Sequence, residues 1–537
     1  ELIKVQSAEA ISTMAEQQLQ NGLILHLRVI KKDGTILEPE LIEGKPTVTM
    51  PHLEVGDYIE TERIESNPGD GQRGLNYSGP RWFFREENIA YARSELVVIS
   101  PKAKPLSIET RNDVPPPEVT ENGPLVVRRW RVQNSPAAPV EPFGAPITEF
   151  LPSVQLGWGV SLNDNLRSMS DAVADTSPVD PRLVRIAEHI VEGVPESART
   201  ERAKRLYRWI LANVQEGEES DGRRVVIGKN GNQWRGYITL CRSLRIPVNY
   251  AVAQNRLSLP PIGPFSEATL FTQPLLRVTA EREPIWLSFA GKYTPFAYVS
   301  AEARGMPAYV LSDDKPVAAK VPSAGAQDNV RYGGKIQLNA DGSADLELEQ
   351  SFFGKYAMGL RNALSEIPEE QLRDVLESRL LGPELRGLEL KSYALDHFDD
   401  LDSPLVIRAR ARIPAFAQRS GDMLLIAPPF GSRVSQLAAL PQRQTPLLMA
   451  EAMHREINLR LLLPSGAVLV NDLAPQTITD GDRSVQVTDT AKPGELTLSR
   501  VVNLPAGRVQ PKDYPRFLSF ARRADDALSQ SIRVKVQ

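Results

Sequence analysis

The sequence predicts a multidomain, mainly β protein whose middle third is α+β. Three observations indicate this: 43 prolines that punctuate the chain with turns, alternating apolar residues in its first and last parts, and helical spacing concentrated in the middle. A chain of 537 residues is also too long for one hydrophobic core. We predict an N-terminal β-sandwich over residues 1–155, an α+β core over 156–322, and a C-terminal β-sandwich with one inserted helix over 323–537.

The N-terminal part reads as strands. Residues 23–30 are rich in apolar side chains and lead through the turn Lys32-Asp33-Gly34 into 35–37, which predicts a hairpin. Further strands are expected at 58–64, 95–99 and 125–132, each flanked by Gly, Pro or Asn.

The middle part changes to helical spacing. Asp180 followed by Pro181 is typical of a helix start, with a capping side chain and proline in the first turn. Apolar residues then repeat at helical intervals over 183–191, 203–214 and 234–244. Strands are expected at 248–253, 274–279 and 284–289, so three helices precede a sheet.

The strand pattern returns in the last part. A hairpin is expected around Asp341-Gly342, with strands at 405–413 and 457–461. One helix is predicted over 368–381, and the strand order cannot be derived from the pattern.

Composition narrows the possible environments and partners. The net charge of −4 does not favour nucleic acid or an anionic membrane as a partner. One cysteine excludes an intrachain disulfide, and no apolar run reaches the length of a transmembrane segment. The chain begins at Glu1 without a signal peptide, and we expect a fragment whose targeting signal lies outside this sequence.

Three stretches together resemble the bacterial proteins in which a domain of unknown function (DUF3857) precedes a transglutaminase-like core. They are residues 29–35 with 53–60, residues 203–214 leading through Gly228 to Leu244-Arg245-Ile246-Pro247, and residues 504–511 with 514–517. The resemblance implies a papain-like α+β core with a Cys-His-Asp triad, in which a thiol at a helix N terminus is activated by the helix dipole and a neighbouring imidazole.

The triad positions implied by this resemblance carry other residues. Asn230 falls at the cysteine position, Gln273 at the histidine position and Ser288 at the aspartate position. None of these side chains ionises near neutral pH, and loss of one triad member alone typically costs roughly 10³-fold or more in rate. We therefore expect a degenerate, inactive core.

The sequence does not favour a displaced thiol nucleophile, a zinc site or a phosphate-binding loop. Cys241 lies on the apolar face of its predicted helix, so a buried structural thiol is favoured over a displaced nucleophile. The five histidines are scattered, with none between residues 190 and 396, which argues against zinc. Gly228-Lys229-Asn230-Gly231 lacks the serine or threonine of a phosphate-binding loop. No cofactor is expected.

A residual cleft is the remaining candidate site. If the resemblance holds, Trp234, Arg235 and Trp286 would lie near the former active site and suit a sugar or a peptide. The alternative, that the two tryptophans only fill the core, stays open.

The leading hypothesis is a non-catalytic binding or scaffold module of the bacterial periplasm, outer membrane or cell surface, with a protein or glycan partner. The alternative is a divergent transglutaminase or cysteine-peptidase-like enzyme with a rearranged active site. A third possibility is a purely structural component without a ligand cleft. The sequence does not identify the partner or the oligomeric state.

Overall fold

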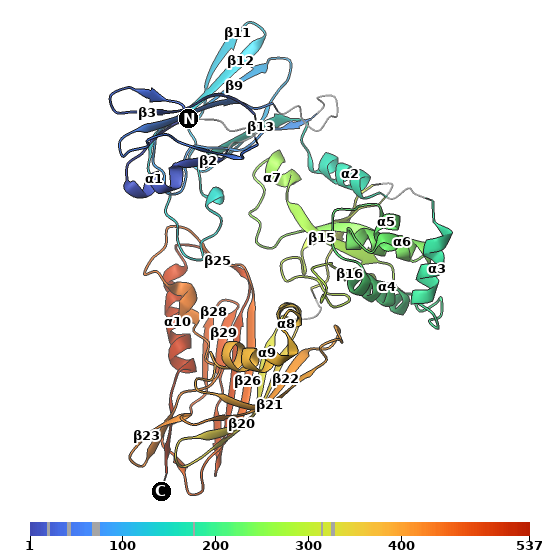
Figure 1. Ribbon diagram of the computed structural model, residues 1–537, viewed down its shortest axis with the longest axis vertical. Coiled ribbons are helices and arrows are strands. Elements are labelled where there is room, and N and C mark those ends of the chain that lie inside the picture. The colour runs from blue at the N-terminus through green and yellow to red at the C-terminus, as the bar shows by residue number, and fades with distance from the viewer. Residues whose placement is uncertain are drawn as a thin grey trace. The chain divides into compact units, whose positions relative to one another are not determined.

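The computed structural model describes residues 1–18, 22–39, 44–66, 76–174, 178–312, 315–323 and 328–536. It divides into two compact units, Glu1–Ser78 and Gly79–Gln537 (Figure 1).

The first unit is built on an antiparallel sheet of order β1-β6-β3-β4. The predicted hairpin is confirmed: β3 pairs with β4, and the turn glycine Gly34 has φ of 87°. The small core contains Val5, Val29, Met50 and Ile59. The elements are β1 (Leu2–Lys4), α1 (Ala8–Met14), β2 (Glu16–Gln18), β3 (Leu23–Ile30), β4 (Ile36–Leu37), β5 (Thr47–Thr49), β6 (Tyr58–Ile64) and β7 (Tyr77–Ser78).

The second unit begins with a separate β region. One sheet has the order β11-β12-β9, and β13 pairs with β10 and β8. Phe84, Trp130 and Val154 form its core, which is distinct from that of the first unit. The prediction of one sandwich over 1–155 is therefore wrong, because these residues form two small cores. The strands are β8 (Trp82–Phe83), β9 (Tyr91–Pro101), β10 (Ser107–Arg111), β11 (Glu118–Asn122), β12 (Leu125–Ser135) and β13 (Ser153–Trp158), with a short helix η1 (Ile147–Glu149).

The middle part combines helices with a sheet, as expected, but it contains more elements than the three helices and three strands that the sequence predicts. Asp180 caps α3 through the backbone N–H of Arg182, as its position before Pro181 predicts. The helices are α2 (Leu162–Val173), α3 (Pro181–Ile190), α4 (Arg199–Asn213), α5 (Gly222–Gly228), α6 (Gln233–Ser243) and α7 (Pro264–Ala268). The sheet has the order β16-β15-β14-β17-β18 and contains β14 (Val248–Gln254), β15 (Phe271–Val278), β16 (Ile285–Leu287), β17 (Pro307–Val310) and β18 (Val317–Lys320).

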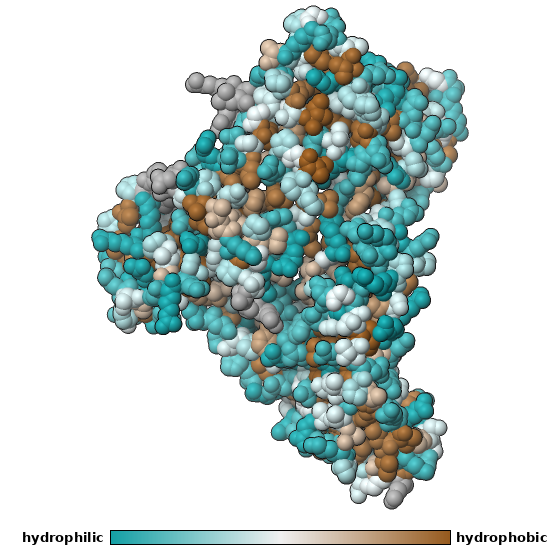
Figure 2. All heavy atoms as spheres, turned by 180° about the vertical axis from the view of Figure 1, so that it is seen from behind, coloured by the Kyte–Doolittle hydropathy of each residue, from teal (hydrophilic) through white to brown (hydrophobic). Residues whose placement is uncertain are grey.

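A nine-stranded sheet forms most of the last part, in the order β21-β22-β20-β19-β26-β31-β29-β28 with β30 paired to β31. Its strands are β19 (Val330–Leu338), β20 (Ala344–Phe352), β21 (Glu389–Asp396), β22 (Leu405–Ile413), β26 (Met453–Leu462), β28 (Gln476–Asp480), β29 (Arg483–Val487), β30 (Thr490–Lys492) and β31 (Glu495–Leu504). A second sheet, β23-β24-β33-β27, joins β23 (Ala417–Ser420), β24 (Met423–Ile426), β33 (Ile532–Lys535) and β27 (Val468–Leu469), and β25 (Leu447–Met449) pairs with β32 (Gly507–Val509). Apolar side chains gather at the end of this part (Figure 2). On and next to the sheet β23-β24-β33-β27, Leu425, Val468 and Val470 are exposed.

The prediction of one inserted helix in this part is wrong. The expected helix is α9 (Glu369–Val375), continued by the π-helical turn η2 (Leu376–Leu381). Two more helices are present, α8 (Lys355–Ser365) and α10 (Tyr514–Leu528), besides the short η3 (Val434–Ala438). In α10, the residues Phe517, Phe520, Ala521, Ala524 and Leu528 are buried at helical spacing, a local signal that the prediction of one inserted helix did not include.

Ion pairs and hydrogen bonds between partly or fully buried side chains tie the segments of the second unit together. Arg508 contacts Glu149, and Arg443 lies 3.5 Å from Glu141. Glu109 on β10 accepts hydrogen bonds from the backbone N–H and the hydroxyl of Ser266 on α7, each 2.9 Å. The β region, the α+β part and the last part are thus linked by specific polar contacts.

Candidate functional site

Helix α6 begins where the resemblance would place a reactive thiol. Gly231 precedes it with φ of 126°, and a Cβ at this position would lie 2.6 Å from the backbone oxygen of Glu219. Asn232 is the cap: its backbone N–H donates to that same oxygen at 2.8 Å, and its side-chain oxygen accepts from the N–H of Arg235 at 3.4 Å. The turn therefore requires glycine and fixes the start of the helix.

Asn230 lies two residues before this cap. The segment around it is paired with residues 215–217, since Gln215 donates to the backbone oxygen of Lys229 at 3.0 Å and Gly231 donates to that of Gln215 at 2.9 Å. A Cβ at Gly217 would come within 2.8 Å of Asn230 Oδ1, so the Asn230 amide lies against Gly217. The side chain at the predicted nucleophile position is an exposed amide.

Glu216 brings a carboxylate to the first turn of α6. Its Oε2 accepts a hydrogen bond from the backbone N–H of Gln233 at 3.3 Å. The first N–H groups of a helix carry partial positive charge and lack partners within the helix. Glu216 therefore places a negative charge at the positive end of helix α6.

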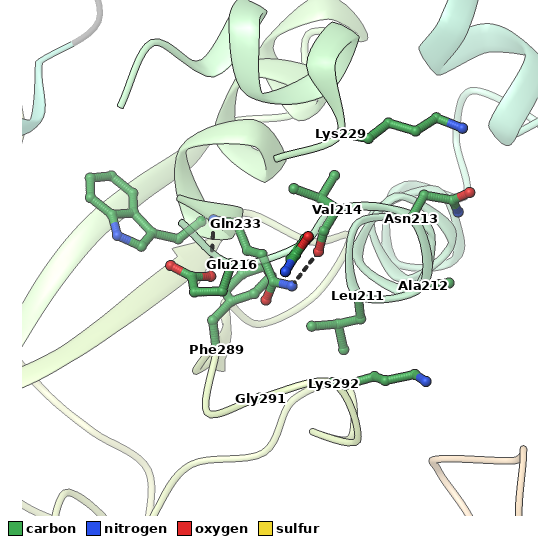
Figure 3. Close-up of a pocket in the computed structure, with 12 residues that line it drawn as sticks. Leu211, Ala212, Asn213, Val214, Glu216, Lys229, Gln233, Phe289, Gly291 and Lys292 are labelled. Atoms are coloured by element: carbon green, nitrogen blue, oxygen red, sulfur yellow. Dashed lines mark hydrogen bonds between the residues drawn. The ribbon is translucent and has the colours of Figure 1, made fainter. Parts of the chain in front are cut away.

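A cavity of 770 Å³ opens beside this helix end. Gln233 is only 6% exposed, and its Nε2 donates to the backbone oxygen of Val214 at 2.7 Å (Figure 3). Lys229, after α5, and Lys292, after β16, lie on either side of the last turn of α4 (Figure 3). The lining residues are Leu211, Ala212, Asn213, Val214, Gln215, Glu216, Lys229, Gln233, Trp234, Phe289, Gly291 and Lys292.

Gln273 does not face this cavity. It pairs with Ala253 on β14, and residues paired across adjacent strands share a face of the sheet. Ala253 and Leu275 belong to the cluster on one face, whereas Leu276 and Val278 pack in the cluster that contains the buried side of α6. Gln273 therefore lies on the face opposite α6.

The hydroxyl and the backbone N–H of Ser288 are engaged in local hydrogen bonds. Its hydroxyl and its backbone N–H both donate to the backbone oxygen of Tyr298, each at 3.1 Å. Its own backbone oxygen accepts from the hydroxyl of Tyr207 at 2.7 Å. None of Asn230, Gln273 and Ser288 lines the cavity, so the structure does not bring the three together there.

Of the predicted cleft residues, only Trp234 lines the cavity. Its ring packs against Tyr250, with ring centroids 4.8 Å apart. Arg235 instead donates to the backbone oxygens of Val173 and Ala172, at the end of α2. Trp286 is 6% exposed and packs on the opposite face of the sheet, in the cluster with Ala251 and Leu275.

Cys241 is sealed within the core. It is fully buried among Tyr237, Leu240 and the other residues of the cluster beneath α6. Burial raises the pKa of the Cys241 thiol to about 12. The thiol is therefore neutral near pH 7 and inaccessible to solvent, unlike the exposed, low-pKa thiols of reactive cysteines.

The sequence analysis did not find Glu216, Gln233, Phe289 and Lys292. Glu216 meets α6 only because residues 215–217 pair with 229–231, a long-range contact without a local sequence signal. For Gln233 the sequence signal is weak: a polar glutamine stands at the first position of helix α6, where it is buried although an apolar side chain could be buried there equally well. Phe289 and Lys292 lie in the loop after β16, whose path the pattern does not define.

Comparisons with known proteins point to the fold. Residues 422–534 match the family model of a domain of unknown function, DUF3858. A solved structure of a candidate protease from Parabacteroides distasonis ATCC 8503 is similar over 100% of this chain and 94% of its own, with a TM-score of 0.62 and 12% identity. A candidate cysteine protease from Cytophaga hutchinsonii aligns with 40% of this chain and 78% of its own at 12% identity, but its TM-score is 0.17. No curated protein matches the sequence.

The first of these structures shows that the architecture is shared along the whole chain. At 12% identity the likeness concerns the fold alone. Within the described ranges, no group of three His, Cys, Asp or Glu residues is placed to hold a metal ion. Among the helices that the structure describes, none is long and apolar enough to cross a membrane.

Proposed function

We propose that the protein is a non-catalytic transglutaminase-like module that binds a protein or glycan partner in the cavity beside the N terminus of α6. The observation that supports this is the lining of the cavity. Its twelve residues include amides, lysines, a glutamate and two aromatic rings, but no cysteine, serine, threonine or histidine. A site built this way offers contacts to a ligand without the thiol or hydroxyl nucleophile of an acyl-transfer reaction.

The size and lining of the cavity suit a ligand of several residues. Its volume of 770 Å³ falls within the range of ligand pockets, about 300–1,000 Å³. Leu211, Val214 and Phe289 supply apolar surface, and Gln233 and the two lysines supply polar contacts. This combination of apolar wall and few polar groups is typical of recognition sites.

A selection experiment tests the proposal. The purified chain is used to enrich a displayed random heptapeptide library and to probe a glycan array, in parallel with Ala212→Trp, which places a large ring in the cavity. We expect enriched ligands that bind the wild type and lose at least tenfold in affinity with Ala212→Trp. The control is Ala439→Trp, an exposed alanine far from the lining in sequence. If neither library yields a ligand sensitive to Ala212→Trp, the cavity is not a binding site.

The second candidate function is a divergent protease or transglutaminase. It is favoured by the whole-chain likeness to the candidate protease, and the burial of Cys241 counts against it. Assays of peptide cleavage, amine incorporation and glutamine deamidation, each with wild type and Cys241→Ala, separate the two functions. Activity abolished by Cys241→Ala would establish the enzyme and overturn the non-catalytic proposal.

We further propose that the protein acts in the bacterial periplasm, at the outer membrane or on the cell surface, as the resemblance implies. Immunodetection in cell fractions of the source bacterium tests this placement. Recovery of the protein only with cytoplasmic markers would contradict it.

A further inference from the structure

We propose that the N terminus of α6 is a carboxylate-binding site that Glu216 fills from within the chain, and that a carboxylate of an acidic peptide ligand takes its place. This inference rests on the proposed function, since it names the class of ligand that the cavity receives. Four features of the lining lead to it.

The first feature is a pair of backbone donors. Gln233 N–H donates to Glu216 Oε2 at 3.3 Å, while the next N–H, that of Trp234, has no acceptor among the residues that the structure describes. The Asn232 cap serves the N–H of Arg235. Two adjacent N–H groups at a helix N terminus suit the two oxygens of one carboxylate.

The second feature is the buried side chain of Gln233. Nε2 is fixed on the backbone oxygen of Val214, so the orientation of the amide is set (Figure 3). Within the described part of the chain, Oε1 accepts no hydrogen bond, and the residue lines the cavity while being only 6% exposed. A peptide N–H supplies the donor that this oxygen lacks, which favours a peptide over a simple anion.

The third feature is the charge at the cavity edge. Lys229 and Lys292 line the cavity, and neither forms an ion pair with any described residue. The nearby acidic residues do not cancel them: the Glu219 carboxylate accepts from the N–H of Asp221 and lies 3.7 Å from Arg224. Glu218 does not line the cavity. The lysines therefore attract a negatively charged ligand.

The fourth feature is that Glu216 is held loosely. Glu216 is exposed to solvent. The 3.3 Å between its Oε2 and the backbone nitrogen of Gln233 is longer than the roughly 2.7–2.9 Å of a strong charge-assisted hydrogen bond. An exposed carboxylate with one long hydrogen bond loses little interaction energy when it moves away from the helix end. A ligand carboxylate can therefore replace it at small cost.

The test uses peptides enriched from the heptapeptide library described above. Each acidic peptide is synthesised in a carboxylate form and in a matched carboxamide form, with every Glu and Asp replaced by Gln and Asn. Fluorescence anisotropy measures both forms against wild type, Glu216→Gln, Lys292→Gln and Glu218→Gln. Glu218→Gln removes the same charge from a neighbouring position outside the cavity and is the matched control.

We expect the carboxylate form to bind wild type at least tenfold more tightly than the carboxamide form. Glu216→Gln should tighten binding of the carboxylate form by about threefold to tenfold and leave the carboxamide form unchanged, because a resident competitor is removed. Lys292→Gln should weaken the carboxylate form, and Glu218→Gln should leave both forms unchanged. Equal binding of the two forms, or an equal effect of Glu216→Gln and Glu218→Gln, overturns this inference while the proposed function stands. Absence of any cavity-dependent ligand overturns the proposed function itself.

Discussion

The guanidinium of Arg508 and the carboxylate of Glu149, 359 positions apart in the chain, share two hydrogen bonds of 2.6 and 2.8 Å. The same guanidinium donates to the backbone oxygen of Leu257 at 2.7 and 3.1 Å. One side chain thus joins the short helix η1, the loop after β14 and strand β32. The two side chains of the pair are 14% and 16% exposed, so solvent weakens the contact only partly.

We predict that Arg508→Ala destabilises the second unit by about 2 kcal/mol, because it leaves Glu149 without its charged partner and the Leu257 oxygen without a donor. Arg508→Lys should recover part of the loss. Urea unfolding followed by tryptophan fluorescence measures both. Arg460→Ala is the control, since Arg460 pairs with Glu495 on the surface and should cost less than about 1 kcal/mol. A loss no larger than that of Arg460→Ala would show that the junction is not stabilising.

Gly228 and Gly231 should differ in how substitution by alanine changes the stability of the protein. Gly231 has φ of 126°, and a Cβ at this position would lie 2.6 Å from the backbone oxygen of Glu219, so Gly231→Ala should destabilise by about 1–3 kcal/mol. Gly228 lies in α5 with open space around its Cβ position, so Gly228→Ala should be neutral or stabilising by up to about 1 kcal/mol. Thermal unfolding of the two variants compares them directly. Equal effects would mean that the turn before α6 is not constrained as described.

Glu109 should make stability depend on acid pH. Burial alone would raise the pKa of this carboxyl, but hydrogen bonds from Ser266 and Arg81 outweigh it and lower the pKa below its usual value. A lowered folded-state pKa gives stability that is present above the unfolded value, about 4.3, and is lost as the pH falls through the folded value. Glu109→Gln should therefore be less stable than wild type at pH 7, and the difference should shrink below about pH 4.

Urea midpoints of wild type and Glu109→Gln between pH 7 and pH 3 measure this difference. Glu118→Gln, at an exposed position on β11, is the control and should show a small, constant difference. A difference between wild type and Glu109→Gln that stays constant across the range would contradict the assignment.

The face of the sheet decides whether an imidazole can reach position 230. With Asn230→Cys, adding Gln273→His should leave the reactivity of the new thiol unchanged, because position 273 lies on the face opposite α6. Pro274 pairs with Val252 on the other face, so Pro274→His should lower the thiol pKa. The pH dependence of iodoacetamide labelling measures both, and buried Cys241 should not react in the folded protein. A lower thiol pKa with Gln273→His than with Pro274→His would restore the original triad alignment.

Local patterns predicted the secondary structure well where apolar spacing and caps agree. The hairpin β3–β4 and the helix that starts after Asp180 follow from turn and cap residues that act within a few positions. The predicted helix over 234–244 is α6, within one residue at each end. These signals are local, so a single sequence contains them.

Packing could not be predicted in the same way. Residues 1–155 offered one run of strands, and only long-range contacts divide them between the core of Val29 and that of Trp130. The irregular pairing of β14 and β15 near Gln254 is likewise invisible in the sequence. Glu216 lies in the candidate site because a β-bridge between Gln215 and Asn230 joins two loops. Spacing gives the order of site residues, but the sheet face and loop path decide which of them meet.

The nine-stranded sheet has a consequence for how the protein is made. Strand β19 pairs on one side with β20, its neighbour in sequence, and on the other side in parallel with β26, which follows only after β20 to β25. While the ribosome adds the intervening residues, that second edge of β19 exposes unpaired N–H and C=O groups beside buried positions such as Ile336 and Leu338. Open edges of this kind pair readily with other chains. The last part of the protein therefore passes through an aggregation-prone stage during synthesis, and chains interrupted before β26 should depend on chaperones to stay in solution.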